Sequence, residues 1–237
     1  MRFARRPAAS TTDELLRAVR LHGHAAANVA ERIAGPLVPF RSAWDDLGPD
    51  PYLPARFGRR ERRYAAFDLT TPGGEPRPLP ARPHVQAPEH NRLFGGLERT
   101  FAPVDRATLT GAPLRSFLAL AAQTLHALEG APVRYRGELH LFRVHAAGGV
   151  AWPTPEGVHR DGRDWVLVLL VDRRDVRGGR LAVLGPDDDD VRAVHPMRSP
   201  FDLAILDDRR VRHVATPIRG AGRRDTLVVT FRRLGDA

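Results

Sequence analysis

A histidine and an aspartate stand two residues apart in the stretch EGVHRDGRD, residues 156–164. In an extended segment, residues i and i+2 project to the same side, so His159 and Asp161 would offer a nitrogen and an oxygen to one point while Arg160 points away. The flanking Gly157 and Gly162 allow a close approach of the backbone to a bound ligand. Taken alone, the pair is more typical of a polar turn before the apolar run WVLVLLV.

The third ligand of such a metal site has to come from elsewhere in the chain. There is no cysteine, so a metal would be held by nitrogen and oxygen ligands. Of the ten histidines, His213 is the best candidate, because it follows the predicted buried strand DLAILDD and begins another. Two histidines and one carboxylate leave open positions on the metal, as in non-haem Fe(II) oxygenases.

Arg224 supplies a cation eleven residues after His213, at the start of the last predicted strand. Its guanidinium could pair with the distal carboxylate of a metal-chelated 2-oxoglutarate through two parallel hydrogen bonds. Thr226 lies two residues further on the same strand face and could add a hydroxyl donor. Arg223 remains an alternative anchor, because strand alternation is uncertain by one residue at a turn.

Several other polar residues invite a role that the sequence supports less well. His140 or Arg143 could face the pocket, and Arg143 could hold a substrate carboxylate. Asp207 and Asp208 could orient His213, although at least one of them is expected to close a turn with Arg209. The remaining histidines beside predicted strands have no carboxylate at i+2, and we interpret them as ordinary: His145 and His195.

The first half of the chain predicts two helices around an irregular region. A capping box at Thr11 and Glu14 begins a helix that we expect to continue to Ile33, weakened by Gly23. Residues 35–100 are rich in Pro and Gly and predict irregular structure with short edge strands. Between Pro113 and Gly130, apolar residues recur on one helical face, so we expect an amphipathic helix packed on a sheet.

From residue 133 onward the pattern changes to successive strands separated by glycine-containing turns. Many short strands without intervening helices indicate an antiparallel sandwich or jelly-roll barrel. We expect a mainly β, α+β chain in one domain, 1–237, with helical and irregular support in 1–132 and the β core in 133–235. The run DDDD at 187–190 predicts a solvated hairpin tip. The turn signals are Gly148-Gly149, Gly178-Gly179, Gly185-Pro186 and Gly220-Ala221-Gly222.

The composition limits the possible partners. The net charge is +9, but all 37 basic residues are Arg, and they are scattered among acidic residues without a basic arm or stacking platform, which argues against nucleic-acid binding. Such a surface would attract small anions. No apolar run could cross a bilayer, and the basic stretch MRFARRPAAS is followed by charged residues rather than a signal-peptide core, so we expect a cytoplasmic protein without a membrane partner.

The motifs PTPEGVHRDGRDWV, RGGRLAVL, LDDRRVRHVATPI and RRDTLVVTFR resemble those of 2-oxoglutarate-dependent Fe(II) dioxygenases related to bacterial L-isoleucine hydroxylase, which oxidise free L-amino acids. The resemblance is dense over residues 135–233 and weaker upstream, in RRYAAFDLT and RLFGGLERTFAPVD. Three positions depart from the family pattern: His140 stands where Gln is expected, Val214 where Gly is usual, and Arg180 where an acidic residue is usual. These departures bear on the substrate more than on the iron.

This resemblance implies a double-stranded β-helix, a cupin-like jelly-roll, with His159, Asp161 and His213 as iron ligands and Arg224 as the 2-oxoglutarate anchor. It implies an enzyme that uses Fe(II), 2-oxoglutarate and O2 to hydroxylate a small substrate, expected to be a free amino acid, with release of succinate and CO2. Halogenating relatives lack the carboxylate, so Asp161 favours hydroxylation, and sulfoxidation of a thioether stays open. A non-catalytic cupin-like binding barrel and an Arg-rich nucleic-acid binder are the alternatives; the oligomeric state is undetermined.

Overall fold

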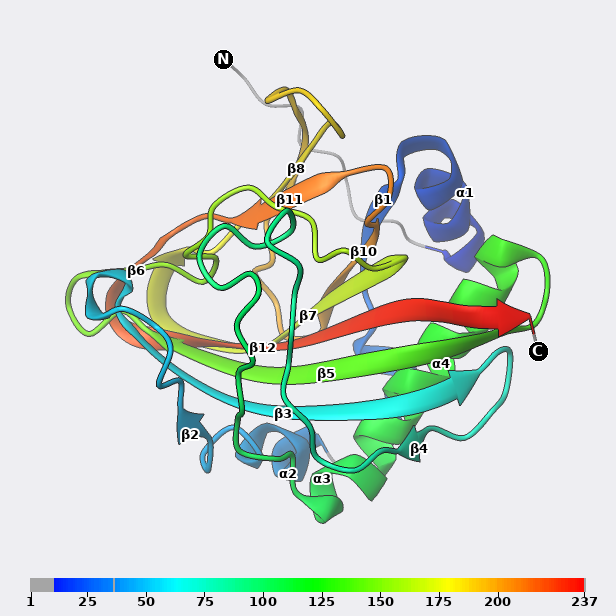
Figure 1. Ribbon diagram of the computed structural model, residues 1–237, viewed down its shortest axis with the longest axis horizontal. Coiled ribbons are helices and arrows are strands. Elements are labelled where there is room, and N and C mark those ends of the chain that lie inside the picture. Colours follow the sequence, from blue (N-terminus) through cyan, green and yellow to red (C-terminus); the bar gives the residue numbers. More distant parts are fainter. Residues whose placement is uncertain (1–10, 36, 237) are drawn as a thin grey trace.

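Two antiparallel sheets face each other and form the core of the protein (Figure 1). The computed structural model describes residues 11–35 and 37–236. The large sheet has the strand order β1-β10-β7-β12-β5-β3-β2, and the small sheet has the order β11-β8-β9. The mainly β, double-stranded β-helix architecture with helices packed outside is therefore confirmed.

The large sheet is built from both halves of the chain, because β1, β2 and β3 complete a sheet whose other main strands follow residue 133. Its strands are β1 (His24–Asn28), β2 (Gly48–Pro49), β3 (Arg59–Thr70), β4 (Arg77–Pro78), β5 (Val133–His145), β6 (Val150–Ala151), β7 (Trp165–Gly178), β10 (Asp202–Asp207) and β12 (Ile218–Asp236). The small sheet contains β8 (Leu181–Leu184), β9 (Val191–His195) and β11 (Arg212–Ala215).

Helices cover the outer face of the large sheet, opposite the small sheet (Figure 1). They are α1 (Thr12–His22), α2 (Leu37–Ser42), α3 (Arg106–Thr110) and α4 (Ala112–Glu129), with short 3-10 turns η1 (Ala30–Arg32) and η2 (Ala55–Phe57). The predicted amphipathic helix is α4, with Pro113 in its first turn and Gly130 at its C-cap in the left-handed conformation. Phe117 and Leu125 of this helix are fully buried against the sheet.

Strand β7 explains the apolar run WVLVLLV. Its odd-numbered residues from Trp165 to Val171 belong to the core beneath the helices, whereas Val166, Val168 and Leu170 pack towards the small sheet. A strand buried on both faces needs apolar residues at every position rather than at alternate ones. The central strand thus holds the two layers together.

Helix α1 ends earlier than the sequence predicts. The capping box at Thr11 and Glu14 is present, but the helix stops at His22, and Gly23 takes a left-handed φ of 76°. The following residues form β1 and pair with β10, with His24 opposite Leu206. The expected helix to Ile33 is wrong because Gly23 caps the helix and the free edge of β10 supplies backbone partners for the next residues.

The last predicted turn is also wrong. Strand β12 runs through Gly220-Ala221-Gly222 with a shift in its register against β7 between Gly220 and Arg223. A Cβ on Gly220 would lie 2.2 Å from the carbonyl oxygen of Asp175. These glycines therefore allow β7 to approach closely at a bulge, rather than reversing the chain.

The irregular region between residues 35 and 100 contains one longer element than expected. Strand β3 pairs with β5 over twelve residues, from Arg59 to Thr70, whereas the sequence predicted only a short edge piece. The segment 79–105 then rises past β3, β5 and β12 towards β11 (Figure 1). The DDDD run is exposed in the β8–β9 connection, as predicted.

Among the residues that the structure describes, no helix is both long and apolar enough to span a membrane. The basic stretch at residues 1–10, on which the expectation about a signal peptide depends, lies outside the described residues.

Candidate metal centre and co-substrate site

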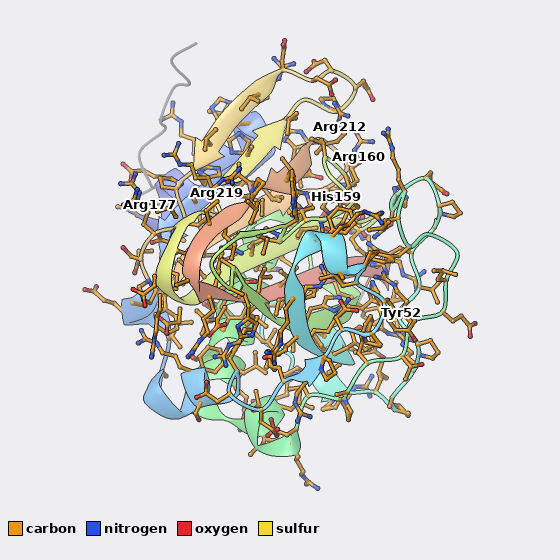
Figure 2. All side chains as sticks on the ribbon, turned by 90° about the vertical axis from the view of Figure 1, so that its left-hand side faces the viewer. Tyr52, His159, Arg160, Arg177, Arg212 and Arg219 are labelled. Carbon is orange, nitrogen blue, oxygen red and sulfur yellow. The ribbon has the colours of Figure 1, made fainter. Side chains whose placement is uncertain are left out.

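A short backbone pairing brings the three candidate metal ligands together. His159 and His213 form an isolated antiparallel bridge, in which each backbone N–H donates to the carbonyl oxygen of the other, at 3.1 and 2.9 Å. The extended backbone at His159 then places Asp161 on the same side, as its i+2 spacing predicts. Arg160 turns outward to Pro186 at the β8–β9 tip, near Arg212 (Figure 2).

The donor atoms of the three side chains converge. All of them lie within 4.8 Å of one another. The Nε2 atom of His213 is 3.4 Å from Oδ2 of Asp161, and Nε2 of His159 is 3.9 Å from Oδ1 of the same carboxylate. Two imidazole nitrogens and one carboxylate oxygen at these separations match the donor set of a non-haem Fe(II) site with open positions.

The surroundings of the two imidazoles suit a bound cation. Nδ1 of His159 donates to the carbonyl oxygen of Gly157 at 3.0 Å, so Nε2 carries the lone pair in the neutral ring. Burial, together with the nearby His159, lowers the pKa of His213 to about 3, which keeps this ring neutral. Burial opposes charge on His159 too, but Glu156 and Asp161 raise its pKa, which indicates a site that favours a cation.

Asp208 supports the candidate metal centre through the backbone. Its carboxylate accepts hydrogen bonds from the N–H groups of Asp161 and Arg163, at 3.1 and 3.0 Å. It lies 4.0 Å from Nδ1 of His213, beyond hydrogen-bond distance. The neighbouring Asp207 binds the guanidinium of Arg209 through both oxygens, which closes the turn between β10 and β11 as expected.

One cavity contains these ligands and most of the polar residues of interest. Alternate residues of three neighbouring strands of the large sheet face it, as the two-residue period of a strand requires. The cavity is also lined by residues of β11 and of the loops at 84–99 and 153–161. The strand residues are Arg60 and Arg62 of β3, His140, Phe142 and Val144 of β5, and Arg224, Thr226 and Val228 of β12.

Arg224 is buried in this cavity with most of its donors free. It is 2% exposed, and its Nε and Nη2 atoms have no hydrogen-bond partner among the described residues. Burial, reinforced by Arg173, lowers the pKa of Arg224 to about 10, so the side chain stays charged at neutral pH. A buried guanidinium with unused donors fits a carboxylate ligand.

Arg224 and Arg223 lie on opposite faces of β12, because side chains alternate along a strand. Arg223 is 29% exposed in its side chain and lies 3.6 Å from Asp45, on the face that does not line the cavity. Thr226 faces the cavity beside Arg224, as the sequence predicts. Of the two arginines left open by the sequence, the structure thus brings only Arg224 to the cavity.

The two substrate-binding candidates fall on opposite faces of β5. His140 lines the cavity, where its Nδ1 accepts a hydrogen bond from Arg62 at 2.7 Å. Arg143 does not line it, because its guanidinium binds both oxygens of Asp225, each at 2.8 Å, and Asp45 at 3.0 Å. The suggestion that Arg143 holds a substrate carboxylate is therefore wrong, since odd-numbered residues of β5 face the other way.

Sequence reasoning missed the residues that the loop at 84–99 adds to the site. Gln86 donates from Nε2 to Oδ1 of Asp161 at 3.3 Å, and its Oε1 accepts from Arg99 at 2.8 Å and from Asn91 at 2.9 Å. Glu156 also faces the cavity, 3.8 Å from Nε2 of His159. No local spacing marks the contacts of Gln86, because they depend on how an irregular loop folds over the sheet, whereas Glu156 stands only three residues before His159.

A second group of potential metal ligands lies nearby, formed by His84, Glu138 and His140. Both oxygens of Glu138 are already used, by Tyr64 at 3.0 Å and by Arg163 at 2.7 Å. With the guanidinium of Arg62 on His140, two positive charges oppose a metal cation there, and the group acts as a structural hydrogen-bond network.

Comparison with known proteins identifies the family. The profile of the 2OG-Fe dioxygenases matches residues 41–230, which include all the candidate ligands and Arg224. The chain belongs to the 2OG-Fe dioxygenase family. This dioxygenase is accordingly an enzyme that depends on Fe(II), 2-oxoglutarate and O2. No curated protein sequence matches the chain.

Solved structures of similar proteins share the fold of this dioxygenase. A BsmA homologue from Methylobium petroleophilum PM1 is 29% identical, with a TM-score of 0.83 over 100% of this chain and 98% of that one. IDO from Bacillus thuringiensis is 14% identical, with a TM-score of 0.76 over 98% and 99%. The Fe(II)/(alpha)ketoglutarate-dependent dioxygenase TqaL is 16% identical, with a TM-score of 0.71 over 95% and 88%.

Proposed function

We propose that this dioxygenase hydroxylates a free L-amino acid, with the iron on His159, Asp161 and His213. Iron with 2-oxoglutarate and O2 supplies the oxidation, which releases succinate and CO2. The observation that carries the proposal is the single cavity that combines a His-Asp-His donor set with buried cations. Family membership favours this enzyme over the non-catalytic barrel that the sequence left open.

The chain's own residues have distinct parts in this proposal. Asp208 fixes the backbone at Asp161, and the carbonyl of Gly157 orients the ring of His159, so the donors are held before the metal arrives. Arg224 pairs with the distal carboxylate of 2-oxoglutarate, and Thr226 lies beside it. Asp161 completes the donor set with a carboxylate, which favours hydroxylation over halogenation. The resemblance of the sequence motifs to those of L-isoleucine hydroxylase relatives supports an amino-acid substrate.

A mass-spectrometric screen tests this function. The protein is incubated with Fe(II), 2-oxoglutarate, ascorbate and each of the twenty L-amino acids. We expect one or a few amino acids to gain one oxygen atom, with release of an equal amount of succinate. Gain of oxygen by methionine alone would indicate sulfoxidation, and gain by none of the twenty would exclude the proteinogenic amino acids as substrates.

Replacing His159 with Ala tests the assignment of the metal ligands. We expect His159→Ala to abolish turnover and to weaken Fe(II) binding, while the circular dichroism spectrum and melting temperature without metal stay close to those of the wild type. Arg160→Ala, which removes the outward-facing neighbour, serves as the control and should retain activity. Turnover that survives in His159→Ala would show that the iron lies elsewhere.

A further inference from the structure

A second group of buried arginines lines the same cavity on the side of β3. Arg60, Arg62 and Arg99 are 6%, 3% and 2% exposed. A buried charge is costly unless another charge or a set of hydrogen bonds compensates it. Three buried guanidiniums on one wall of the cavity therefore require anionic partners to compensate their charges.

The protein itself provides one buried carboxylate beside this group, that of Asp50. Its Oδ2 accepts from Nε and lies close to Nη2 of Arg60, at 2.8 and 2.7 Å, and it is 3.8 Å from Nη1 of Arg62. Its Oδ1 accepts from the backbone N–H of Tyr52. Asp50 is thus saturated by Arg60, and it compensates one positive charge of the three.

The other two guanidiniums make hydrogen bonds to neutral side chains, and Arg62 has Asp50 only at the longer distance of 3.8 Å. Arg62 stacks 3.6 Å from the ring centroid of Phe101 and donates to His140, whereas Arg99 donates to Gln86. The Nε atoms of both arginines are buried and lack a hydrogen-bond partner in the part of the chain that the structure describes. Burial and the charge of Arg60 lower the pKa of both side chains, and this effect outweighs the opposing charges of Asp50 and Glu156.

This group is distinct from the Arg224 site. Arg60, Val144 and Arg224 occupy one row across β3, β5 and β12, so Arg224 lies two strands away, roughly 10 Å at the usual strand spacing. On the other side, Gln86 links Arg99 to Asp161 by one side chain. An anion on Arg62 and Arg99 would therefore lie beside the metal centre without occupying the position of an anion on Arg224.

We propose that Arg62 and Arg99 form a second anion subsite, which binds the carboxylate of the amino-acid substrate. This inference rests on the proposed function. Besides the candidate metal ligand Asp161, the acidic side chain that lines the same cavity is Glu156, and its Oε2 is buried without a hydrogen-bond partner among the described residues. Two guanidiniums and a carboxylate oxygen without a hydrogen-bond partner, in one cavity, match the two charged groups of an amino-acid zwitterion.

The carboxylate subsite is tested by removing the negative charge of the ligand. Binding to the protein loaded with Fe(II) and 2-oxoglutarate is measured anaerobically by calorimetry, for the amino acid found in the screen and for its amide. We expect the amide to bind at least tenfold more weakly. Equal binding of acid and amide would overturn the proposal, and this comparison requires no variant that has to fold.

The matched test in the protein uses Arg99→Gln, with Arg56→Gln as the control because Arg56 is exposed outside the cavity. Loss of a charge-assisted hydrogen bond should weaken amino-acid binding roughly 10- to 100-fold in Arg99→Gln and leave 2-oxoglutarate binding unchanged. Unchanged amino-acid binding in Arg99→Gln, or an equal loss in the control, would overturn the subsite.

A separate probe distinguishes failure of the subsite from failure of the amino-acid function. If no amino acid gains oxygen, hexanoate is titrated into the same loaded protein. Binding that is lost in Arg99→Gln would support a carboxylate subsite for another class of acid. No binding to the wild type would overturn the subsite itself.

Discussion

At the scale of single residues, two adjacent arginines have opposite surroundings. Arg224 is buried with free donors in the cavity, whereas Arg223 is partly exposed and paired with Asp45. A carboxylate ligand gains most from a guanidinium that is already desolvated and unpaired. The pair therefore provides a variant and its control at neighbouring positions.

We predict that Arg224→Gln weakens 2-oxoglutarate binding by about 2 kcal/mol, or roughly 30-fold, because a charge-assisted hydrogen bond is lost. Fe(II) affinity should change little, since Arg224 is not among the metal donors. Arg223→Gln should leave both constants nearly unchanged. Anaerobic calorimetry with 2-oxoglutarate and the Fe(II)-loaded protein measures the effect, and a larger loss in Arg223→Gln would move the anchor to the other face of β12.

Strand periodicity explains which residues could be predicted. His159, Asp161, Arg224 and Thr226 share faces because i and i+2 residues of extended backbone do, and this much is readable from sequence. The sequence left open whether His140 or Arg143 faces the pocket, because which face of β5 points inward depends on the packing of the strand against its neighbours. The structure shows the orientation of Arg143 on this strand, because its guanidinium binds Asp225 and Asp45 on the face away from the pocket.

At the scale of elements, the β7–β8 connection packs directly against Arg224. Gly179 has a φ of +66°, and a Cβ on it would lie 2.8 Å from Cδ and 3.0 Å from Nε of Arg224. Gly148, in the turn after β5, has a similar φ of +81° but no atom within 4 Å of such a Cβ, counting the described residues. An alanine would have the same left-handed backbone strain at both positions. Only at Gly179 would its Cβ also press against Arg224.

We predict that Gly179→Ala and Gly148→Ala lose similar stability, about 1 kcal/mol each, because both place a Cβ in the left-handed region. Only Gly179→Ala should also displace Arg224 and weaken 2-oxoglutarate binding severalfold. Thermal unfolding and calorimetry on both variants separate the two effects. Equal 2-oxoglutarate affinity in the two variants would mean that Arg224 accommodates the added methyl group without moving from its anchor position.

The glycine-rich turn signals were predicted with mixed success for a physical reason. Glycine permits both a chain reversal and a close approach between strands, and the local sequence does not distinguish them. Gly178-Gly179 connects β7 to β8 as expected, whereas Gly220-Ala221-Gly222 lies inside the continuous strand β12. Likewise, Gly23 ends α1 because β10 offers an edge to the residues that follow, which is a tertiary effect.

At the scale of the whole molecule, Glu138 joins segments that are far apart in the sequence. Glu138 of β5 accepts a hydrogen bond from Tyr64 of β3 and one from Arg163, two residues after the candidate ligand Asp161. It also lies 3.6 Å from Nδ1 of His84 in the covering loop. None of these partners is near it in sequence, so this network could not be predicted. It anchors the loop that carries Gln86 to the sheet beneath.

The charge of Glu138 should make this anchoring depend on pH. Burial alone would raise the pKa of Glu138, but His84 and Arg163 outweigh it and hold the pKa well below its usual value near 4.3. A carboxylate with a depressed pKa in the folded state contributes stability above its unfolded pKa and loses it as the pH falls through the folded value. The contribution should therefore be complete at neutral pH and begin to decline below about pH 4.3.

We predict that Glu138→Gln lowers the free energy of unfolding by about 3 kcal/mol at pH 7, because it leaves the largely buried guanidinium of Arg163, 15% exposed, without its anion. The difference from the wild type should shrink progressively below about pH 4, where protonation removes the same charge from the wild type. Urea unfolding at pH 7, 5, 4 and 3 measures it. Glu75→Gln, which removes an exposed partner of Arg115, should show little effect at any pH. A constant difference between Glu138→Gln and the wild type over the whole pH range would mean that shape and hydrogen bonding, rather than charge, hold the covering loop to the sheet.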